Sequence, residues 1–405
     1  MKVDPDAAGM SGARLERITE HFSRHYVEAG KIAGCQTTVV RGGLVAYQRS
    51  LGLMDRVAAR PMGDDTIFRI FSMTKPIASL ALMQLYERGL FQLLDPVHRY
   101  IPEWRTLQVG SVQPDGSVQL AKPERPMNVR DVLMHMTGLP GALFPGNSID
   151  EAFGAARAAQ AKGMTLEGVT ALLAEHPLKF QPGTQWNYGI STDIVGRLVE
   201  ILSGQRFDDY LRAEIFEPLG MVDTGFFVPP ESVDRLAACY SYRPANTPAR
   251  MEGPEADRFL RPRSYLSGAG GLVSTSHDYV AFCQMLANGG QLDGRRVLGR
   301  KTLELMTRNH LPGGATLEDL AVGGFGEAGF EGVGFGLGFA VGLGPAATGM
   351  AGSAGDFYWG GAASTAFWVD PVEDLYTVFM TQLFPSMAYP FRAQLRALVY
   401  QAIED

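Results

Sequence analysis

This chain of 405 residues has no long apolar run and few cysteines. No stretch approaches the roughly 20 apolar residues that a membrane-spanning helix needs, so we expect no membrane partner. Residues 1–6 are acidic and interrupted by proline, without the apolar segment of a signal peptide. Cys35, Cys239 and Cys283 are odd in number and far apart, which predicts reduced, buried thiols in a cytoplasmic protein.

Several functional motifs are also missing. No cysteine has a CxxC partner and no histidine–cysteine cluster has zinc spacing, so we expect no metal and no cofactor. The net charge of −7 is modest for this length, which argues against a nucleic-acid partner. No serine carries the flanking glycines of a nucleophile elbow, and no spaced carboxylate pair indicates a glycosidase.

What the chain does contain is apolar material for a large core, at 46% of all residues. Its spacing predicts strands near both ends and helices at the termini. We expect strands at 36–40 and 44–49, 333–341, and 365–369 and 375–381, and terminal helices at 12–30 and 390–403. The alternating glycines of 333–341 lack the GxGxxG spacing of a nucleotide loop. We interpret them as points where another element approaches a strand closely.

The middle of the chain has helical spacing interrupted by proline and glycine. The helices are expected at 130–136, 149–161, 166–174, 193–202 and 207–214. This order predicts an α/β fold of the α+β type, with an antiparallel sheet built from both termini, flanked by helices, and an inserted, mainly helical lobe. We expect residues 1–75 and 262–405 to form the α/β lobe and residues 76–261 the helical lobe.

Ser72-Met73-Thr74-Lys75 is the most informative motif. Residues 68–71 before it are typical of a short strand, and the apolar spacing from residue 77 to Gly89 predicts a helix. A serine and a lysine three residues apart then lie on one helical face, one turn apart. Serine is a poor nucleophile unless a base removes its proton, and a buried lysine amine can be that base.

Two structural interpretations stand beside the catalytic one. Ser72 could cap a helix while Lys75 is solvated, because one chance Ser-x-x-Lys is expected in roughly a third of such chains. His135, at the end of a predicted helix, is the histidine that most resembles a base, but a structural role is favoured there.

Two further segments join this motif, Trp186–Asp193 and Tyr358–Ala363. With Ser72–Lys75 they resemble the serine β-lactamase and penicillin-binding-protein superfamily of class C type. Within it, the chain is similar to the family VIII carboxylesterases. Supporting blocks, among them Leu133–Leu139 and Gly270–Thr275, extend the resemblance over about residues 12–400.

The resemblance implies roles for individual residues. Ser72 is the nucleophile that accepts the acyl group, and Lys75 and Tyr188 form its base system. Trp359-Gly360-Gly361 occupies the place of the substrate-binding Lys-Thr-Gly strand of β-lactamases. In the same register, the backbone N–H of Ala362 joins that of Ser72 as an oxyanion donor. Without the resemblance, a core tyrosine is the favoured interpretation of Tyr188.

The chain also departs from the family pattern. Tyr188 is followed by Gly189-Ile190, so the asparagine of the Tyr-x-Asn element is missing. Trp359 replaces a lysine that helps to hold a substrate carboxylate, which favours neutral esters. Phe144 and Trp186 flank the motifs and are candidates for lining a substrate pocket, with a core role as the alternative.

We therefore expect a serine carboxylesterase that hydrolyses short- to medium-chain esters through an acyl-enzyme, with a small-molecule ester as its partner. The alternatives are an acyltransferase or transesterase with the same site, and a weak β-lactamase or D-Ala-D-Ala peptidase. A non-catalytic sensing or interaction protein with the same fold is a further alternative.

Overall fold

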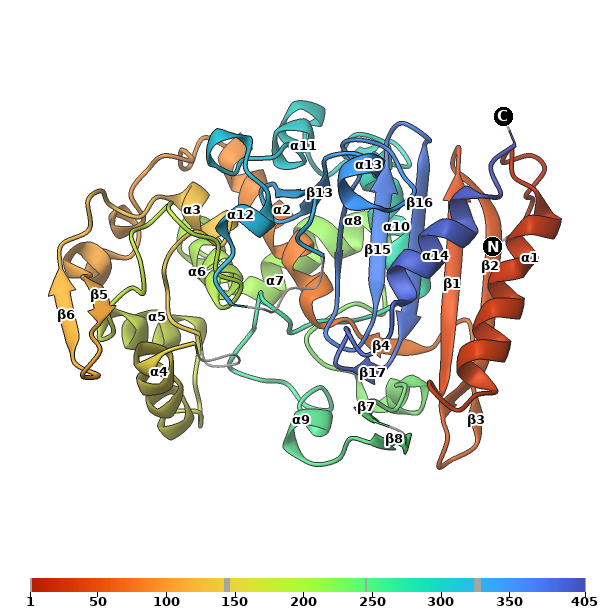
Figure 1. Cartoon of the computed structure of the whole chain (residues 1–405), viewed down its shortest axis with the longest axis horizontal. Coiled ribbons are helices and arrows are strands. Elements are labelled where there is room, and N and C mark those ends of the chain that lie inside the picture. Colours follow the sequence, from red (N-terminus) through yellow and green to blue (C-terminus); the bar gives the residue numbers. More distant parts are fainter. Residues whose placement is uncertain (1, 142–145, 245, 324–328, 405) are drawn as a thin grey trace.

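The computed structural model describes residues 2–141, 146–244, 246–323 and 329–404. A large antiparallel sheet dominates it (Figure 1), and its strands run in the order β12-β13-β14-β15-β16-β1-β2-β3. Their bounds are β1 (Gly34–Arg41), β2 (Leu44–Asp55), β3 (Arg60–Pro61), β12 (Val333–Phe335), β13 (Ala340–Gly342), β14 (Phe357–Gly360), β15 (Ala366–Asp370) and β16 (Leu375–Thr381).

The two ends of the chain meet in the middle of this sheet. β1 pairs antiparallel with β16, with Thr38 opposite Val378, and with β2 on its other side. The β1–β2 turn contains Gly42 and Gly43, both at positive φ, where glycine carries no steric cost. The predicted sheet built from both termini is therefore confirmed, as are the two predicted hairpins.

Helices cover both faces of the sheet, because strand side chains alternate between the faces. On β16, Phe379 lies 5.1 Å from Phe22 of α1 (Gly12–Phe22), between ring centroids, and 5.8 Å from Phe391 of α14 (Phe391–Tyr400). Val378, which precedes Phe379, pairs with Phe367 of β15, and Phe367 contacts Tyr279 of α10 (Ser276–Ala287) on the opposite face. Figure 1 shows α1 and α14 side by side in front of the sheet.

A mainly helical region follows the first strands in the chain. Its helices are α2 (Thr74–Glu87), α3 (Val129–Leu133), α4 (Ser148–Ala159), α5 (Leu166–Ala174), α6 (Ser191–Ser203), α7 (Phe207–Leu211) and α8 (Glu217–Leu219). Helix α2 packs against α6 and is buried on every side from Thr74 to Leu85. It lies between the helical region and the sheet (Figure 1), so its N-terminus lies at their junction. The lobe boundaries at 75/76 and 261/262 stay a prediction.

The remaining elements are short and connect these parts. They are β4 (Ile67–Arg69), β5 (Val109–Val112), β6 (Val118–Ala121), β7 (Tyr240–Arg243), β8 (Asn246–Arg250), β9 (Val273–Thr275), β10 (Gln291–Leu292), β11 (Arg295–Arg296), β17 (Leu383–Phe384), α9 (Pro254–Asp257), α11 (Arg300–Met306), α12 (Leu317–Leu320) and α13 (Pro345–Thr348). The β4–β9 pair is the one that matters for the site, because β4 leads directly to Ser72.

The single strand expected at 333–341 is wrong, because the segment folds into a hairpin. Phe335 of β12 pairs with Ala340 of β13, and Gly338 turns the chain at a φ of 99°. The interpretation of its glycines is confirmed. A Cβ on Gly336 would overlap the Met306 carbonyl oxygen, and one on Gly338 would overlap the Ser79 side chain of α2.

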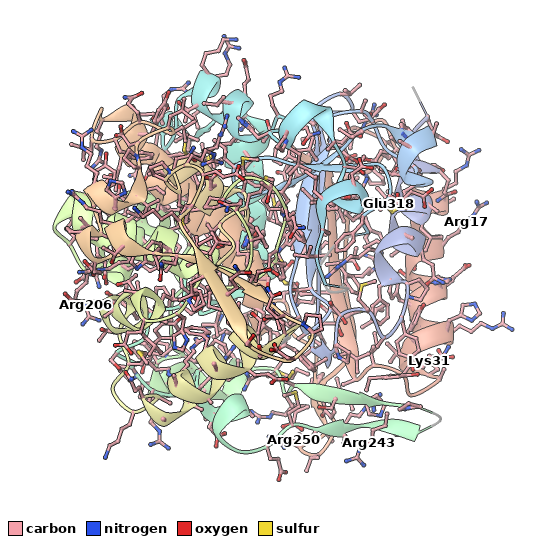
Figure 2. The ribbon with its side chains drawn as sticks, turned by 60° about the vertical axis from the view of Figure 1, so that its left-hand side comes forward. Arg17, Lys31, Arg206, Arg243, Arg250 and Glu318 are labelled. Atoms are coloured by element: carbon pink, nitrogen blue, oxygen red, sulfur yellow. The ribbon has the colours of Figure 1, made fainter. Side chains whose placement is uncertain are left out.

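Many charged side chains lie at the periphery, around this apolar interior. Figure 2 shows Arg17, Arg206 and Arg243 at different edges of the molecule. Arg206 is 62% exposed in its side chain and pairs with the acidic residues that follow it in sequence, Asp208 and Asp209. Within the described ranges, no helix is both long enough and apolar enough to cross a bilayer.

The glycine packing of this hairpin is testable. We expect Gly336→Ala to lower the free energy of unfolding by about 1–3 kcal/mol, the usual cost of overpacking, because the added methyl group meets a backbone oxygen. Gly225→Ala is the matched control, since its Cβ would meet its nearest neighbour at an ordinary 3.8 Å. Denaturant unfolding measures both, and equal stability of the two variants would contradict the packing argument.

Candidate active site

Ser72 lies on a short 3₁₀ turn, η2 (Phe71–Met73), between β4 and α2. The strand expected over 68–71 ends at Arg69, because Phe71 adopts a left-handed φ of 43°. Such a conformation is strained for a non-glycine residue and is common at functional sites. It turns the chain sharply, so that Ser72 lies two residues before Thr74, the first residue of α2, near the N-terminus of that helix.

Buried hydrogen bonds hold this turn from two sides. The Tyr279 hydroxyl of α10 donates to the Met73 carbonyl at 3.0 Å, and the Leu272 N–H donates to Thr74 Oγ1 at 3.1 Å. Gln382 acts as a further strand partner of β4. Its amide nitrogen donates to the Arg69 carbonyl at 3.0 Å, while its oxygen accepts from the Arg69 N–H at 3.1 Å.

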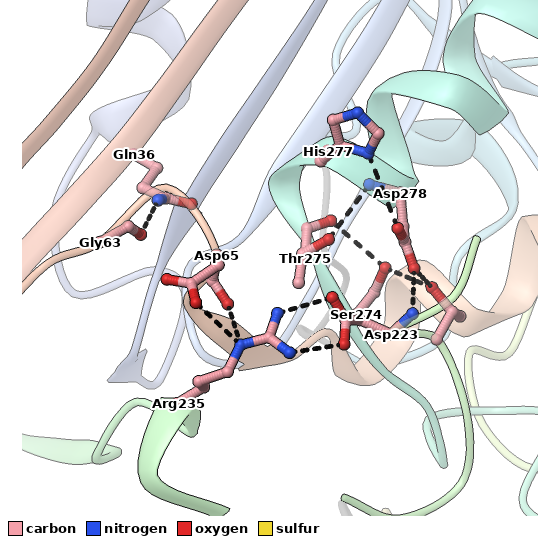
Figure 3. Close-up of polar contacts among 10 residues, drawn as sticks. Gln36, Gly63, Asp65, Asp223, Arg235, Ser274, Thr275, His277 and Asp278 are labelled. Carbon is pink, nitrogen blue, oxygen red and sulfur yellow. Dashed lines mark hydrogen bonds and ion pairs between the residues drawn. The ribbon is translucent and has the colours of Figure 1, made fainter. Parts of the chain in front are cut away.

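A network of ion pairs and hydrogen bonds stabilises the β4–β9 pair (Figure 3). The guanidinium of Arg235 contacts Asp65, which precedes β4, at 3.1 Å, and Asp223, beside β9, at 2.6 Å. Buried Asp278 accepts hydrogen bonds from the Asp223 N–H and the Thr224 hydroxyl, both at 2.8 Å. These contacts fix β4, the strand that leads to Ser72.

Lys75 is buried beside Ser72, with only 4% of its surface exposed. Its Nζ lies 3.2 Å from Ser72 Oγ and 2.7 Å from the carbonyl oxygen of Ala269. The alternative of a capping serine and a solvated lysine is therefore wrong. Met73 is the N-cap of α2 and has no side-chain cap bond, and Lys75 points into the protein.

Tyr188 approaches the same amine from the loop before α6. The Lys75 Nζ lies 4.4 Å from the centroid of the Tyr188 ring, in cation–π geometry. The indole N–H of Trp359 on β14 donates to Tyr188 Oη at 3.2 Å. The structure thus brings four of the predicted residues together from three distant segments.

Trp186 packs behind Tyr188. Its ring stacks on that of Tyr188 with centroids 5.7 Å apart, and its side chain is 1% exposed. Its backbone is fixed by hydrogen bonds to Leu320 and Val322, at 2.8 and 2.9 Å. These contacts position Tyr188. Phe144, the other candidate pocket residue, lies outside the described residues.

His135 lies in the same aromatic layer, 5.2 Å from the Tyr188 ring between centroids. It is fully buried at a φ of 59°, and its Nε2 lies 3.3 Å from Thr192 Oγ1. Burial, with a smaller contribution from the Lys75 charge, holds the pKa of His135 well below its usual value. The histidine is therefore a neutral packing partner of Tyr188, in line with the structural role favoured from the sequence.

The end of β14 lies against the η2 turn that carries Ser72. A Cβ on Gly361 would overlap the carbonyl oxygen of Ile70, and one on Gly360 would overlap the Arg392 guanidinium. Two bonds, from the Gly361 N–H to the Thr365 carbonyl and from the Ser364 N–H to the Gly361 carbonyl, both 2.9 Å, shape the turn after β14. Ala362 is the partly exposed residue of this turn.

Sequence reasoning missed the residues that hold the site. Tyr279, Gln382 and Ala269 act through hydrogen bonds to the backbone or to Lys75, and no local motif marks such contacts. In the described part of the chain, no group of three or more histidine, cysteine or acidic side chains is arranged to hold a metal ion.

Comparisons with known proteins agree with this geometry. The family model described as Beta-lactamase matches residues 19–401. "Esterase EstB" of Burkholderia gladioli is 31% identical over 98% of both chains. The solved structure of "EstCE1, a hydrolase with promiscuous acyltransferase activity" has a TM-score of 0.79 at 26% identity, covering 96% of this chain and 99% of its own. Simvastatin synthase (LovD) from Aspergillus terreus has a TM-score of 0.78 at 23% identity, with 96% and 97% coverage.

Fold and comparisons together define a serine hydrolase. More particularly, the chain belongs to the beta-lactamase family. The resemblance to β-lactamase-like esterases and the α/β fold class are both confirmed.

The burial of His135 predicts a loss of stability in acid. The folded protein binds a proton at His135 more weakly than the unfolded chain does, so protonation below the ordinary histidine pKa of about 6.5 favours unfolding. One such group costs up to about 1.4 kcal/mol per pH unit. Between pH 7.5 and 5.5, we expect the wild type to lose about 1 kcal/mol more than His135→Asn.

Asparagine suits this test because it is neutral and tolerates the left-handed backbone of residue 135. Denaturant titrations at the two pH values give the two losses. Equal losses would mean that His135 does not determine the acid sensitivity.

Proposed function

We propose that the protein is a serine carboxylesterase that hydrolyses short- to medium-chain carboxylic esters, with Ser72 as nucleophile and Lys75 and Tyr188 as the base system. The observation that carries the proposal is the position of the Lys75 amine, 3.2 Å from Ser72 Oγ and 4.4 Å from the Tyr188 ring centroid. A nucleophile within hydrogen-bond reach of a base, with a third group orienting that base, is the arrangement of covalent catalysis.

Acylation begins when the neutral Lys75 amine accepts the Ser72 hydroxyl proton while Oγ bonds to the ester carbonyl carbon. The carbonyl electron pair moves onto its oxygen, and the tetrahedral intermediate forms. Its collapse breaks the carbon–oxygen bond to the alcohol, and the Lys75–Tyr188 pair returns the proton to the leaving oxygen. The acyl group remains on Ser72 as an ester.

Deacylation uses the same groups in the same order. A water molecule gives a proton to the Lys75–Tyr188 pair and bonds to the acyl carbon, and the Ser72 oxygen leaves with that proton. The Trp359 N–H donated to Tyr188 Oη supports this step, because a donor stabilises the negative charge that develops on the phenolic oxygen.

The oxyanion is assigned to two backbone donors, the N–H groups of Ser72 and Ala362. Ser72 lies at the N-terminus of α2, where the helix dipole favours negative charge. Ala362 follows Gly361, whose packing against Ile70 brings the end of β14 to the nucleophile turn.

The substrate class is inferred from the neutral side chain of Trp359. Trp359 is buried and offers a neutral N–H, so it provides no charge partner for a substrate carboxylate. We therefore place uncharged esters first and anionic β-lactams second, and we assign the chain to the family VIII type with Trp359, Gly360 and Gly361 facing the substrate.

A cytoplasmic location is part of this proposal. Cys35, Cys239 and Cys283 are all free and buried, which suits a reducing compartment.

The roles of the three residues lead to a prediction. We expect Ser72→Ala to abolish hydrolysis of p-nitrophenyl butyrate and labelling by a fluorophosphonate. Lys75→Ala and Tyr188→Phe should each lower kcat by about 10²–10⁴-fold, the usual loss for a proton-transfer group. Initial rates with p-nitrophenyl acetate, butyrate and laurate measure kcat and the chain-length preference together.

Ser79→Ala is the matched control, because it removes a buried hydroxyl from the same helix, seven residues further along. It should keep kcat within about threefold. Activity retained by Ser72→Ala would exclude Ser72 as the nucleophile, and near-normal turnover of either other variant would place the base elsewhere.

Acyl transfer to an alcohol is the second candidate. The observation that favours it is the 26% identity and TM-score of 0.79 to a hydrolase described as having promiscuous acyltransferase activity. Both reactions share the acyl-enzyme and differ only in whether water or an alcohol removes the acyl group.

We expect added methanol or butanol to divert part of the acyl-enzyme to the new ester at unchanged p-nitrophenol release. Chromatography of the products measures the ratio of ester to acid. A ratio that does not rise with alcohol concentration would exclude acyl transfer.

A further inference from the structure

Asp193 is a buried carboxylate that the mechanism above does not use. It lies in the first turn of α6, five residues after Tyr188, and only 3% of its surface is exposed. An acidic residue there is commonly explained by the helix dipole. Its contacts go further, because Oδ1 accepts hydrogen bonds from groups more than 70 residues away in the sequence.

These bonds reach the segment that holds the catalytic lysine. Asp193 Oδ1 accepts from the Ser267 hydroxyl at 2.7 Å and from the Ala269 N–H at 3.0 Å. The carbonyl of the same Ala269 accepts from Lys75 Nζ at 2.7 Å, and Lys75 in turn contacts Ser72 at 3.2 Å. The backbone of Ala269 therefore links the Asp193 carboxylate to the Lys75 amine.

Close packing on both sides fixes the path of the backbone around Ala269. A Cβ on Gly268 would overlap the carbonyl oxygen of Thr192, so this part of the chain passes directly against the first turn of α6. On the other side, Gly270 lies within ordinary contact of the Phe71 backbone, at 3.5 Å from its would-be Cβ. The segment fits between the helix that carries Asp193 and the turn that carries Ser72.

We propose that Asp193 is a positioning residue for the esterase reaction, which fixes the Ala269 carbonyl and through it directs the Lys75 amine at Ser72. This inference rests on the proposed function. Lysine has a long, flexible side chain, so an amine that loses its hydrogen bond to a fixed Ala269 carbonyl samples other rotamers. Misplacement of a catalytic group by about 1 Å can cost on the order of 10²-fold in rate.

The test compares two substitutions at one site. Asp193→Ala removes the acceptor, and we expect kcat for p-nitrophenyl butyrate to fall about 10–100-fold with KM within about threefold. Asp193→Asn keeps an oxygen for the Ser267 hydroxyl and the Ala269 N–H, so it should regain kcat to within about threefold of wild type, with an unmoved pH profile. Ser267→Ala, which leaves the Ala269 bond in place, should lose less than about tenfold.

Each outcome decides the inference. Unchanged kcat in Asp193→Ala, or an Asp193→Asn variant as slow as Asp193→Ala, would overturn it, and a shifted pH profile in Asp193→Asn would show that the charge acts instead of the position. If Asp193→Ala cannot be purified, Asp193→Leu, which is close to aspartate in shape and has no acceptor, replaces it. Ser72→Ala is assayed alongside: activity in that variant defeats the proposed function, whereas an inactive Ser72→Ala with a fully active Asp193→Ala defeats only this inference.

Discussion

The buried Lys75 amine is the group on which the arrangement of the rest of this structure depends. Lys75 is almost completely removed from water, yet its Nζ has a hydroxyl at 3.2 Å, a carbonyl oxygen at 2.7 Å and an aromatic face at 4.4 Å. Burying a polar amine without hydrogen-bond partners costs free energy that is a large part of the marginal stability of a folded protein. These partners come from η2, the segment at 269 and the loop at 188, so placing this one group requires distant parts of the fold.

Helix α6 is the element that connects these partners. Its first turn contacts Thr137 through Ser191, His135 through Thr192, and the 267–269 segment through Asp193. The same turn follows directly on the loop that carries Tyr188. Since α6 also packs along α2, the amine and the phenol are held by one pair of helices.

The sheet contributes a second fixed surface. β14 brings the Trp359 N–H to Tyr188 Oη, and Gly361, directly after this strand, packs closely against Ile70, which precedes the turn that carries Ser72. Gly336 and Gly338 allow the same kind of close approach, because the Met306 carbonyl and the Ser79 side chain of α2 lie too near for a Cβ at these positions. Preorganised polar groups in such a close-packed place need no rearrangement during a reaction.

The sequence by itself determined the elements and the chemistry that is local. Apolar spacing gave α2 up to Gly89, the β1–β2 and β15–β16 hairpins, and the pairing of Ser72 with Lys75, because a helix places residues three apart on one face. The resemblance added Tyr188 and Trp359, whose positions no periodicity indicates. Tertiary structure alone decided the fold of residues 333–341, where close packing against 306–309 and α2 turned an alternating run into a hairpin. It also decided the places of Ala269, Gln382 and Asp193, because contacts between residues far apart in the chain depend on packing, which local spacing does not encode.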